Sequence, residues 1–377
     1  EPGEDSLIIS VEISPNDVAD GSKDFFVKLS NDSNATILAE KDTFQYIIID
    51  NDGQGWFGPG GVGSFGRIDA WHRTDDAVNL SNGNPVTSGS GAWQDRSPNN
   101  LDAFQTNSSF QPLFEDNLWN GVPIIKFEGG ELLEISDNAF MNNASGPQNK
   151  RTIIVPFRTS DNITNRQIIY EEGGGTRGLS IYIEGGNLYI GGWNKADDQG
   201  TSDPTTPWDS PIDGLGAADP QGETDPDDYI YISKSLSTNT PYLAMLQFDF
   251  DPDNPDLGAV YGYVNGELID TLRGAGRLYP HGDDIGIGAL NGGSCFHDPN
   301  DPGGVNMVCG GSGYNFNGYI AEFVSGNIVY NAAERKIVNN YFGAKYLINL
   351  PAGEDIYDYQ DDYNFEVIGI GQETKSA

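Results

Sequence analysis

Residues 179–191 read LSIYIEGGNLYIG and decide the fold class. Two short runs, Leu179–Ile183 and Leu188–Gly191, flank the turn residues Gly185-Gly186-Asn187. Alternation of apolar and polar residues over such short runs is typical of half-buried antiparallel strands. A Gly-Gly-Asn segment between two such runs is a hairpin turn signal. This stretch therefore predicts a β-hairpin in an antiparallel sheet.

The same pattern recurs along the chain, where Gly, Asn, Asp and Pro separate short apolar runs. Asn265-Gly266 is a second hairpin signal. One helix is expected near the end of the chain, because Asn331 can cap its first turn and Glu334 completes a capping box. These elements predict an all-β fold with one short C-terminal helix. Strands are expected over 122–127, 152–157, 167–170, 179–183, 188–191, 229–233, 242–250, 259–264, 285–289 and 319–323.

The chain is strongly acidic. It carries 56 acidic and 20 basic residues, a formal net charge of −36 in 377 residues. Such a charge repels nucleic acid and anionic membrane surfaces, so we expect neither a nucleic-acid partner nor membrane insertion. Carboxylates on loops favour Ca²⁺ instead. High charge and 49 glycines also fit a disordered chain, but the apolar runs are too regular for that interpretation.

Cys295 and Cys309 are the two cysteines, and they stand in one Gly-rich segment. Their closeness predicts a disulfide across a loop, which contributes on the order of 3 kcal/mol in the chain-entropy model. A disulfide implies an oxidising, extracytoplasmic compartment. Two free thiols in a cytosolic protein are the alternative.

One acidic stretch is a candidate calcium site. Residues 249–256 read DFDPDNPD, near the end of an expected strand. Alternation along a strand puts its first carboxylates on one side, and Ca²⁺ prefers oxygen ligands. The Gly and terminal Glu of an EF-hand loop are missing, so a solvated acidic loop is the alternative. The candidate calcium ligands are Asp249, Asp251, Asp253 and Asp256.

Aromatic residues in or near the long loop 193–228 are candidate ligand-binding residues. Sugars stack on aromatic rings beside polar groups, and long loops are often functional. The alternative is that these rings pin the loop to the sandwich. The candidates are Trp193, Trp208, Tyr229 and Tyr231.

The sequence shows no carboxyl pair suited to glycoside hydrolysis, which needs two neighbouring acids. Glu131 and Glu134 are three apart, and Glu171 and Glu172 are adjacent, so on a strand each pair diverges. The histidines leave a Ser-His-Asp triad open, although none stands in a nucleophile-elbow motif. We therefore expect no enzyme activity.

Six segments of residues 67–350 carry a family resemblance: IDAW (68–71), WQDRSPNN (93–100), PIIKFEG (123–129), FNGYIAEF (316–323), NAAER (331–335) and YFGAKY (341–346). Their order resembles the laminin-G/concanavalin A-like domains in large secreted proteins of gliding and marine Bacteroidota. In that family a Trp-x-Asp-x-Ser-x-Asn turn follows the first strand, and a Gly-x-Ile-Ala-Glu strand and a short helix close the sandwich. The resemblance implies a concanavalin A-like jelly-roll β-sandwich with a C-terminal helix, a fold that hosts many activities.

The start of the chain resembles the second half of a Calx-beta domain. The matching segments are FFVKLSN (25–31), ATIL (35–38) and YIIIDND (46–52). The first half of the family pattern is absent, so we expect the chain to begin inside a domain of a longer protein. Calx-beta domains can bind Ca²⁺ through acids at their ends, which implies a calcium role for Asp50 and Asp52. A solvated turn is the alternative.

The two resemblances divide the chain into four parts. Residues 1–52 are the C-terminal half of a Calx-beta-like domain, and 53–66 are a Gly-rich linker. Residues 67–350 are the laminin-G/concanavalin A-like domain, and 351–377 are a linker or the start of a following domain. The family implies export by the type IX secretion system and a place at the cell surface, either anchored to the outer membrane or secreted.

The function predicted from these observations is a non-enzymatic cell-surface adhesin module that binds a glycan or another surface ligand. Calcium is the expected cofactor, and neighbouring domains of the same long chain are expected partners. The resemblance extends to adhesins of gliding motility. The alternative is a structural spacer or tip domain of a surface filament, and a glycoside-active enzyme is the third interpretation.

Overall fold

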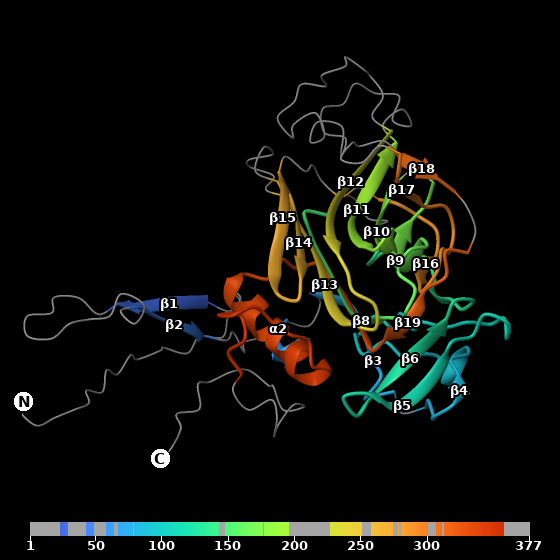
Figure 1. The fold of residues 1–377 in the computed structure, drawn as a ribbon, viewed down its shortest axis with the longest axis horizontal. Coiled ribbons are helices and arrows are strands. Elements are labelled where there is room, and N and C mark those ends of the chain that lie inside the picture. The colour runs from blue at the N-terminus through green and yellow to red at the C-terminus, as the bar shows by residue number, and fades with distance from the viewer. Residues whose placement is uncertain are drawn as a thin grey trace, which may run out of the picture.

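The computed structural model describes residues 23–28, 43–48, 58–63, 67–77, 79–142, 148–175, 177–195, 227–250, 258–273, 278, 280–300, 307–310 and 313–357. Two antiparallel sheets make up most of this part of the chain, with a helix beside the larger sheet (Figure 1). The predicted all-β sandwich with one short C-terminal helix is confirmed.

The larger sheet follows the strand order β15-β14-β13-β8-β19-β6-β5-β4, and β20 pairs with both β3 and β8. All of its printed pairings are antiparallel. Its strands are β3 (Ile68–Arg73), β4 (Asn84–Pro85), β5 (Leu113–Trp119), β6 (Val122–Glu128), β8 (Lys150–Thr159), β13 (Pro241–Asp249), β14 (Ala259–Val264), β15 (Glu267–Arg273), β19 (Asn317–Ile320) and β20 (Glu322–Gly326).

The smaller sheet follows the order β12-β11-β10-β9-β16-β7. It begins as a chain of hairpins, because β9, β10, β11 and β12 pair in sequence order. Its strands are β7 (Leu133–Ile135), β9 (Gln167–Gly173), β10 (Arg177–Glu184), β11 (Asn187–Lys195), β12 (Asp227–Ser235) and β16 (Ile285–Ile287).

Two further hairpins and three helical segments complete the described part. Strands β1 (Lys23–Lys28) and β2 (Thr43–Ile48) pair with each other, as do β17 (Cys295–His297) and β18 (Met307–Cys309). The helical segments are the short 3₁₀ turns η2 (Pro59–Gly61) and η3 (Gly89–Gly91) and the α-helix α2 (Ala332–Tyr346). Among the described residues, no helix combines the length and apolar character that a bilayer crossing requires.

Alternation along β8 separates the two cores of the larger sheet. Ile153 and Val155 point into the space between the sheets, where they join Ile181 and Ile183 of β10. Ile154, between them in sequence, points to the other face and joins the core beneath the helix. Successive side chains of a strand alternate between its faces, so a single apolar strand serves both cores.

The predicted cap of α2 is confirmed. The Asn331 side chain accepts hydrogen bonds from the backbone of Ala333 and Glu334 at 2.9 and 3.0 Å. The Glu334 carboxylate accepts a bond from the backbone N–H of Asn331 at 2.8 Å. The buried face of the helix, including Ile337 and Phe342, packs on the outer face of the larger sheet (Figure 1).

Glu322 fastens this helix to the sheet. Its carboxylate lies fully buried and accepts hydrogen bonds from Trp71 Nε1 at 2.9 Å and from the Tyr341 and Tyr346 hydroxyls at 2.8 Å each. It also pairs with the ammonium group of Lys345. Three segments that carry the family resemblance, 68–71, 316–323 and 341–346, therefore meet at one buried charge. Breaking such a pair on one side costs about 3–5 kcal/mol.

The two hairpin turns predicted from the sequence are confirmed. Gly185 and Gly186 form the β10–β11 turn with φ of 58° and 81°, and Asn265 and Gly266 form the β14–β15 turn with φ of 53° and 82°. The domain boundaries stay predictions. Within the expected linker, Val62 lies buried in the core under α2. The Calx-beta resemblance also stays a prediction: the β1–β2 hairpin is described, but the matching segment 35–38 and both Asp50 and Asp52 lie outside the described residues.

Candidate ligand-binding site

Asp95 organises a tight loop beside β3. Its Oδ1 accepts hydrogen bonds from the backbone of Trp71 and Ser97, each at 2.8 Å. Its Oδ2 accepts bonds from the Ser97 hydroxyl at 2.5 Å and from the backbone N–H of Leu101 at 2.9 Å. The Asn99 side chain in turn donates to the backbone carbonyl of Asp69 at 2.8 Å, and the single Ser97 hydroxyl proton is shared with that carbonyl, whose oxygen also lies 2.8 Å from Ser97 Oγ. The Trp-x-Asp-x-Ser-x-Asn segment of the family resemblance is therefore a turn held together by hydrogen bonds, and we call it the Asp95 turn.

The Asp95 turn positions the residues that follow it in the sequence. The backbone N–H of Asp95 donates to Asp102 Oδ1 at 2.9 Å, which fixes that carboxylate. Ala103 then pairs with Trp93, and Phe104 pairs with Glu134 of β7, as isolated antiparallel bridges. The segment 100–104 is thus held at both ends and forms one wall of a surface pocket, together with residues 88–92.

A second loop forms the opposite wall. It begins after Ile135, and the backbone N–H of Asp137 donates to Asp284 Oδ1 at 2.8 Å. Asn138 Oδ1 accepts bonds from two later backbone N–H groups of the loop, at 3.1 and 2.9 Å. Asn142 donates to Asp137 Oδ1 at 2.5 Å and to the carbonyl of Asp283 at 2.6 Å. Both walls are therefore fixed by internal hydrogen bonds.

The pocket between these walls has a volume of about 330 Å³. This is at the small end of the range for small-molecule sites, which is roughly 300–1,000 Å³. Its apolar part is formed by Ala92, Leu101, Phe104 and Ile135. Its polar part carries hydroxyl, amide and carboxylate groups, which can hydrogen-bond a polyol. The polar lining side chains are Ser88, Asn100, Asp102, Ser136, Asp137 and Asn138.

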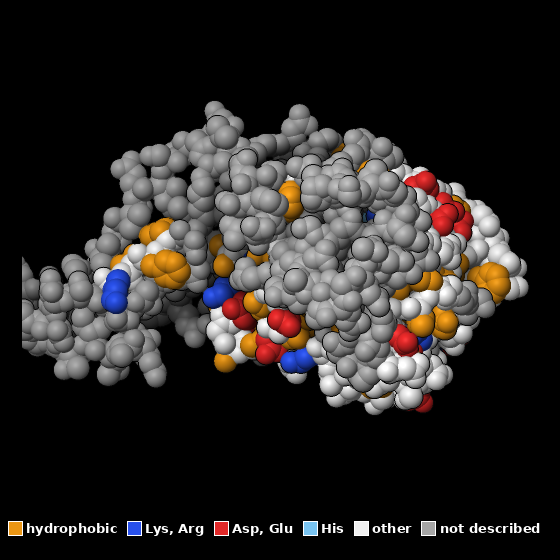
Figure 2. All heavy atoms as spheres, turned by 90° about the horizontal axis from the view of Figure 1, so that it is seen from above, with side chains coloured by type: hydrophobic (Ala, Val, Ile, Leu, Met, Phe, Trp, Pro, Cys, Tyr) orange, Lys and Arg blue, Asp and Glu red, His pale blue; other side chains and the backbone are white. Residues whose placement is uncertain are grey.

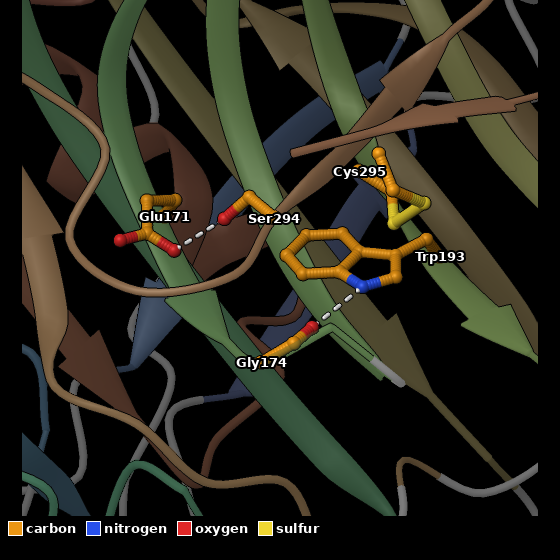
Figure 3. Close-up of a disulfide and its surroundings, with 6 residues drawn as sticks. Glu171, Gly174, Trp193, Ser294 and Cys295 are labelled. Carbon is orange, nitrogen blue, oxygen red and sulfur yellow. Dashed lines mark hydrogen bonds between the residues drawn. A yellow bond between two sulfur atoms is a disulfide. The ribbon is translucent and has the colours of Figure 1, made fainter. Parts of the chain in front are cut away.

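The predicted aromatic candidates lie elsewhere, on the outer face of the smaller sheet. Trp193 and Tyr229 stand opposite each other in the β11–β12 register, and both are 0% exposed. Trp193 lies close over Gly178 of β10, where any Cβ would stand within 2.3 Å of the indole ring. Its Nε1 donates to the carbonyl of Gly174 at 2.9 Å (Figure 3). Packing accounts for both rings without a ligand, so their ligand-binding role stays a prediction.

Tyr231 is half-buried in the same cluster. Its ring centroid lies 6.1 Å from that of Tyr229 and 5.0 Å from that of His297. His297 also stacks on Tyr189 at 4.2 Å, and its Nδ1 is hydrogen-bonded to the Tyr182 hydroxyl at 2.7 Å. Burial lowers the pKa of His297, so its neutral form is favoured in this cluster. The fourth candidate, Trp208, lies outside the described residues.

The β17–β18 hairpin covers this aromatic cluster, and the predicted disulfide is confirmed in it. Cys295 and Cys309 are bonded across the hairpin, 14 residues apart in sequence. Cys295 and Phe296 belong to the same buried cluster as Trp193. Arg166 lies over the Phe296 ring at 4.5 Å. The aromatic residues therefore form a small third core closed by a cross-linked hairpin.

Glu171 lies at the edge of this closed face (Figure 3). It points outward from β9 and is 0% exposed, because the segment leading into β17 covers it. The Ser294 hydroxyl donates to it at 2.7 Å, and the backbone N–H of Asn291 donates at 2.9 Å. Burial raises the pKa of Glu171 to about 8, against the lowering effect of these two hydrogen bonds.

Glu134 and Glu171 share one face of the smaller sheet. Both are register partners of Gly286, one on β7 and the other on β9. Burial and the charge of Asp284 raise the pKa of Glu134. The pairs considered in the sequence, Glu131 with Glu134 and Glu171 with Glu172, were neighbours along the chain and did not include this cross-strand pair. Because Glu171 is fully covered, the pair offers no open catalytic site in this structure.

A second buried charge cluster lies on the inner face. Arg151 is fully buried, donates to Asp69 Oδ2 at 3.0 Å and pairs with Glu172. The Tyr170 hydroxyl also donates to Glu172. Burial raises the pKa of Asp69 to about 7, although the charge of Arg151 opposes the shift. These groups are internal to the sandwich, so they join the sheets rather than meet a ligand.

The calcium candidates are largely outside the described residues. Asp249 ends β13, where its register partners are Lys150 and Ala259. Asp251, Asp253 and Asp256 are not described. Within the part of the chain that the structure describes, no three His, Cys, Asp or Glu side chains are grouped closely enough to hold a metal ion. Calcium binding by the stretch 249–256 stays a prediction.

The described acidic side chains on the face shown in Figure 2 do not form one patch. On the face shown in Figure 2, described acidic side chains appear in separate groups, with a few basic side chains between them. Separate groups of this kind spread the negative charge over that face rather than concentrate it at one place.

Comparisons with known proteins do not assign the chain to a family. No protein-family model matches it, and a search of curated proteins finds no match. Among solved structures, the binding domain of Paraclostridial Mosquitocidal Protein 1 matches at 12% identity and a TM-score of 0.44, over 74% of this chain and 53% of that one. The receptor-binding domain of botulinum neurotoxin D matches at 12% identity and 0.42, over 72% and 52%.

Domain 4 of AbnA, an extracellular arabinanase from Geobacillus stearothermophilus solved with arabinotriose, matches at 11% identity and a TM-score of 0.41, over 71% of this chain and 96% of that one. The chain spans about half the length of the neurotoxin structures that it matches. Scores at this level carry no argument about the ligand of this chain, which has to come from its own residues.

The pocket residues were missed from sequence, although one signal pointed toward them. The turn at 93–99 was recognised as a fold motif, and the residues that it positions, Leu101 and Asp102, follow directly. The opposite wall is more than 30 positions away, and its Asp137 and Asn138 are ordinary turn residues. The pairing of Phe104 with Glu134 brings the two walls together, and the Gln105 side chain donates to the carbonyl of Leu132 beside it at 3.1 Å.

Proposed function

We propose that this chain is a non-catalytic glycan-binding module of an extracellular protein and that the pocket between 88–104 and 135–138 is its ligand site. The observation that carries the proposal is the composition of that pocket: an apolar part with one aromatic ring, Phe104, beside a set of carboxylate, amide and hydroxyl groups. Sugars present C–H faces and hydroxyl edges, which need this combination of apolar and hydrogen-bonding surface.

Rigidity supports the proposal. Asp95 fixes one wall, and Asn138 and Asn142 fix the other, through hydrogen bonds inside the protein. A site that is already ordered loses little conformational entropy when it binds, so modest contacts can give useful affinity. The disulfide supports an oxidising, extracellular setting. The full burial of Glu171, one carboxyl of the Glu134–Glu171 pair, supports a binding module rather than a hydrolase.

The finer parts of the prediction extend this proposal. We propose that the module serves attachment at a cell surface as part of a longer adhesin, with neighbouring domains as further partners. Calcium support, type IX export and gliding rest on the sequence resemblances and on acidic residues that are mostly outside the described part.

The test is an array of neutral, amino and acidic oligosaccharides, followed by titration of the best hit into two variants. Ser88 is exposed at the pocket, so Ser88→Trp should block it and abolish binding without disturbing the core. Ser109→Trp is the matched control, because Ser109 is exposed and does not line the pocket. Binding that survives Ser88→Trp, or an array with no hit, would overturn the proposal.

A further inference from the structure

The two carboxylates of the pocket come from its two different walls. Asp102 belongs to the segment that follows the Asp95 turn, and Asp137 belongs to the loop after β7. Each has one oxygen engaged within the protein: Asp102 Oδ1 accepts from the backbone of Asp95 at 2.9 Å, and Asp137 Oδ1 accepts from Asn142 at 2.5 Å. Among the described residues, no donor lies within hydrogen-bond distance of Oδ2 of either carboxylate.

Among the described residues, no positive charge lines the pocket to balance them, since the described lining contains no Lys, Arg or His. Two basic residues lie close to these walls, one in the sequence and one through a contact, and both already form salt bridges with other carboxylates. Arg96 forms a salt bridge with Asp76 at 2.7 Å, and Arg151 is buried between Asp69 and Glu172. The electrostatic field of the whole chain adds to that of the two pocket carboxylates, because the net charge is −36.

We propose that the pocket selects a sugar bearing a protonated amine, such as a 2-amino-2-deoxy sugar, and rejects sugars with carboxylate or sulfate groups; this inference rests on the glycan-binding function proposed above. An ammonium group between the walls donates to the open oxygens of Asp102 and Asp137. Hydrogen bonds between charged partners are roughly twice as strong as neutral ones. The sugar ring then lies on the apolar part beside Phe104.

A sugar acid meets the opposite situation. Its carboxylate would stand near two like charges with no cation to separate them, and like charges a few ångströms apart repel even near a solvated surface. A neutral sugar keeps its contact with the apolar part and its hydroxyl hydrogen bonds, so it should bind with intermediate affinity. The pocket therefore ranks ligands as amino sugar, neutral sugar and acidic sugar.

Three short probes of equal length test this ranking: the fully deacetylated glucosamine trimer, the N-acetylglucosamine trimer and the galacturonic acid trimer. We expect titration calorimetry at low salt to give a Kd for the amine roughly ten-fold or more below that of the acetylated trimer, with no binding of the acid. The advantage of the amine should shrink at high salt, where exposed charges are screened.

Variants separate the pocket from the general field of the chain. Asp102→Asn with Asp137→Asn should remove the preference for the amine, so that the ratio of the Kd values of the acetylated trimer and the amine falls toward one. Asp161→Asn is the control, because Asp161 is exposed between β8 and β9 and does not line the pocket. It should leave the preference intact. An equal loss of preference in the control would assign the attraction to the whole surface and overturn the inference.

The outcomes also separate this inference from the function beneath it. Equal or tighter binding of the acetylated or acidic trimer would overturn the amine selectivity and leave glycan binding standing. Failure of all three trimers, together with an array without any hit, would remove the proposed function itself.

Discussion

The outer face of the smaller sheet is rich in aromatic rings and closed, whereas the pocket has one aromatic ring and is open. Trp193 and Tyr229 are fully buried beneath the cross-linked β17–β18 hairpin. Ser88 and Asp137 at the pocket are exposed, beside a half-buried Phe104. The comparison teaches that aromatic content does not locate a binding site; what covers the rings decides whether they bind a ligand or form a core.

The largest effect is expected from Trp193→Ala on the closed side. Removing the indole leaves a cavity over Gly178 and deletes the hydrogen bond to Gly174. We expect the free energy of unfolding to fall by about 3–5 kcal/mol in a denaturant titration. Glycan affinity at the pocket should be unchanged wherever the variant is still folded. Loss of binding in a folded variant would break the separation between the two regions.

Replacing both cysteines with serine is expected to have the next largest effect. Cys295 and Cys309 are 14 residues apart, and a cross-link of that length stabilises by on the order of 3 kcal/mol in the chain-entropy model. The melting temperature should fall, and reductant should lower it in the wild type but leave the variant unaffected. A wild type insensitive to reductant after full reduction would show that the hairpin does not need its cross-link.

Asp95→Asn acts on the open side. The amide keeps one acceptor but replaces Oδ2, which receives the Ser97 hydroxyl and the Leu101 N–H. A buried donor left without a partner costs about 1–3 kcal/mol. We expect that loss of stability in denaturant titration, together with weaker glycan binding, because the wall carrying Leu101 and Asp102 loses its anchor. An unchanged glycan affinity would show that the Asp95 turn does not position this wall of the pocket.

The most gradual effect is the pH dependence that comes from Glu171. Its folded-state pKa is raised from 4.5 to about 8, so the folded protein holds the proton after the unfolded chain has released it. The stability from this protonation is fully present below pH 4.5 and is lost progressively as the pH rises to about 8. The slope contributed is at most about 1.4 kcal/mol per pH unit.

Glu171→Gln isolates this contribution, because glutamine does not titrate and can still hydrogen-bond Ser294 and Asn291. The variant should lose the Glu171 part of the pH slope and gain stability over the wild type most clearly near pH 8. Asp69, with a pKa raised to about 7, supplies a slope of the same sign that remains in both proteins. Parallel stability curves for the two proteins would show that Glu171 is not protonated in the folded state.

The fold was predictable because its signals are local. Gly185-Gly186 and Asn265-Gly266 mark turns through backbone conformations that few other residues adopt, and Asn331 with Glu334 marks a helix start. Two cysteines in one short segment predicted their own pairing. Each of these inferences needs only residues that are neighbours in the sequence.

The site was not predictable in the same way, because it depends on strand register. Whether Trp193 is open or buried is decided by Gly178, its partner across the β10–β11 pair, which provides space for the ring. The pocket likewise depends on a pairing between distant residues, because Phe104 pairs with Glu134. Taken one at a time, Asp102 and Asp137 look like solvated turn residues, and only their placement on facing walls gives them a common role.

The most direct test compares Ser88→Trp with Tyr231→Ala by titration calorimetry, using the tightest-binding oligosaccharide from the array and confirming that both variants fold. The first variant obstructs the pocket, and the second removes a half-buried ring of the aromatic cluster. We predict that Ser88→Trp abolishes binding and that Tyr231→Ala retains the wild-type Kd. Retained binding in Ser88→Trp with loss in Tyr231→Ala would contradict the account and place the ligand on the aromatic face.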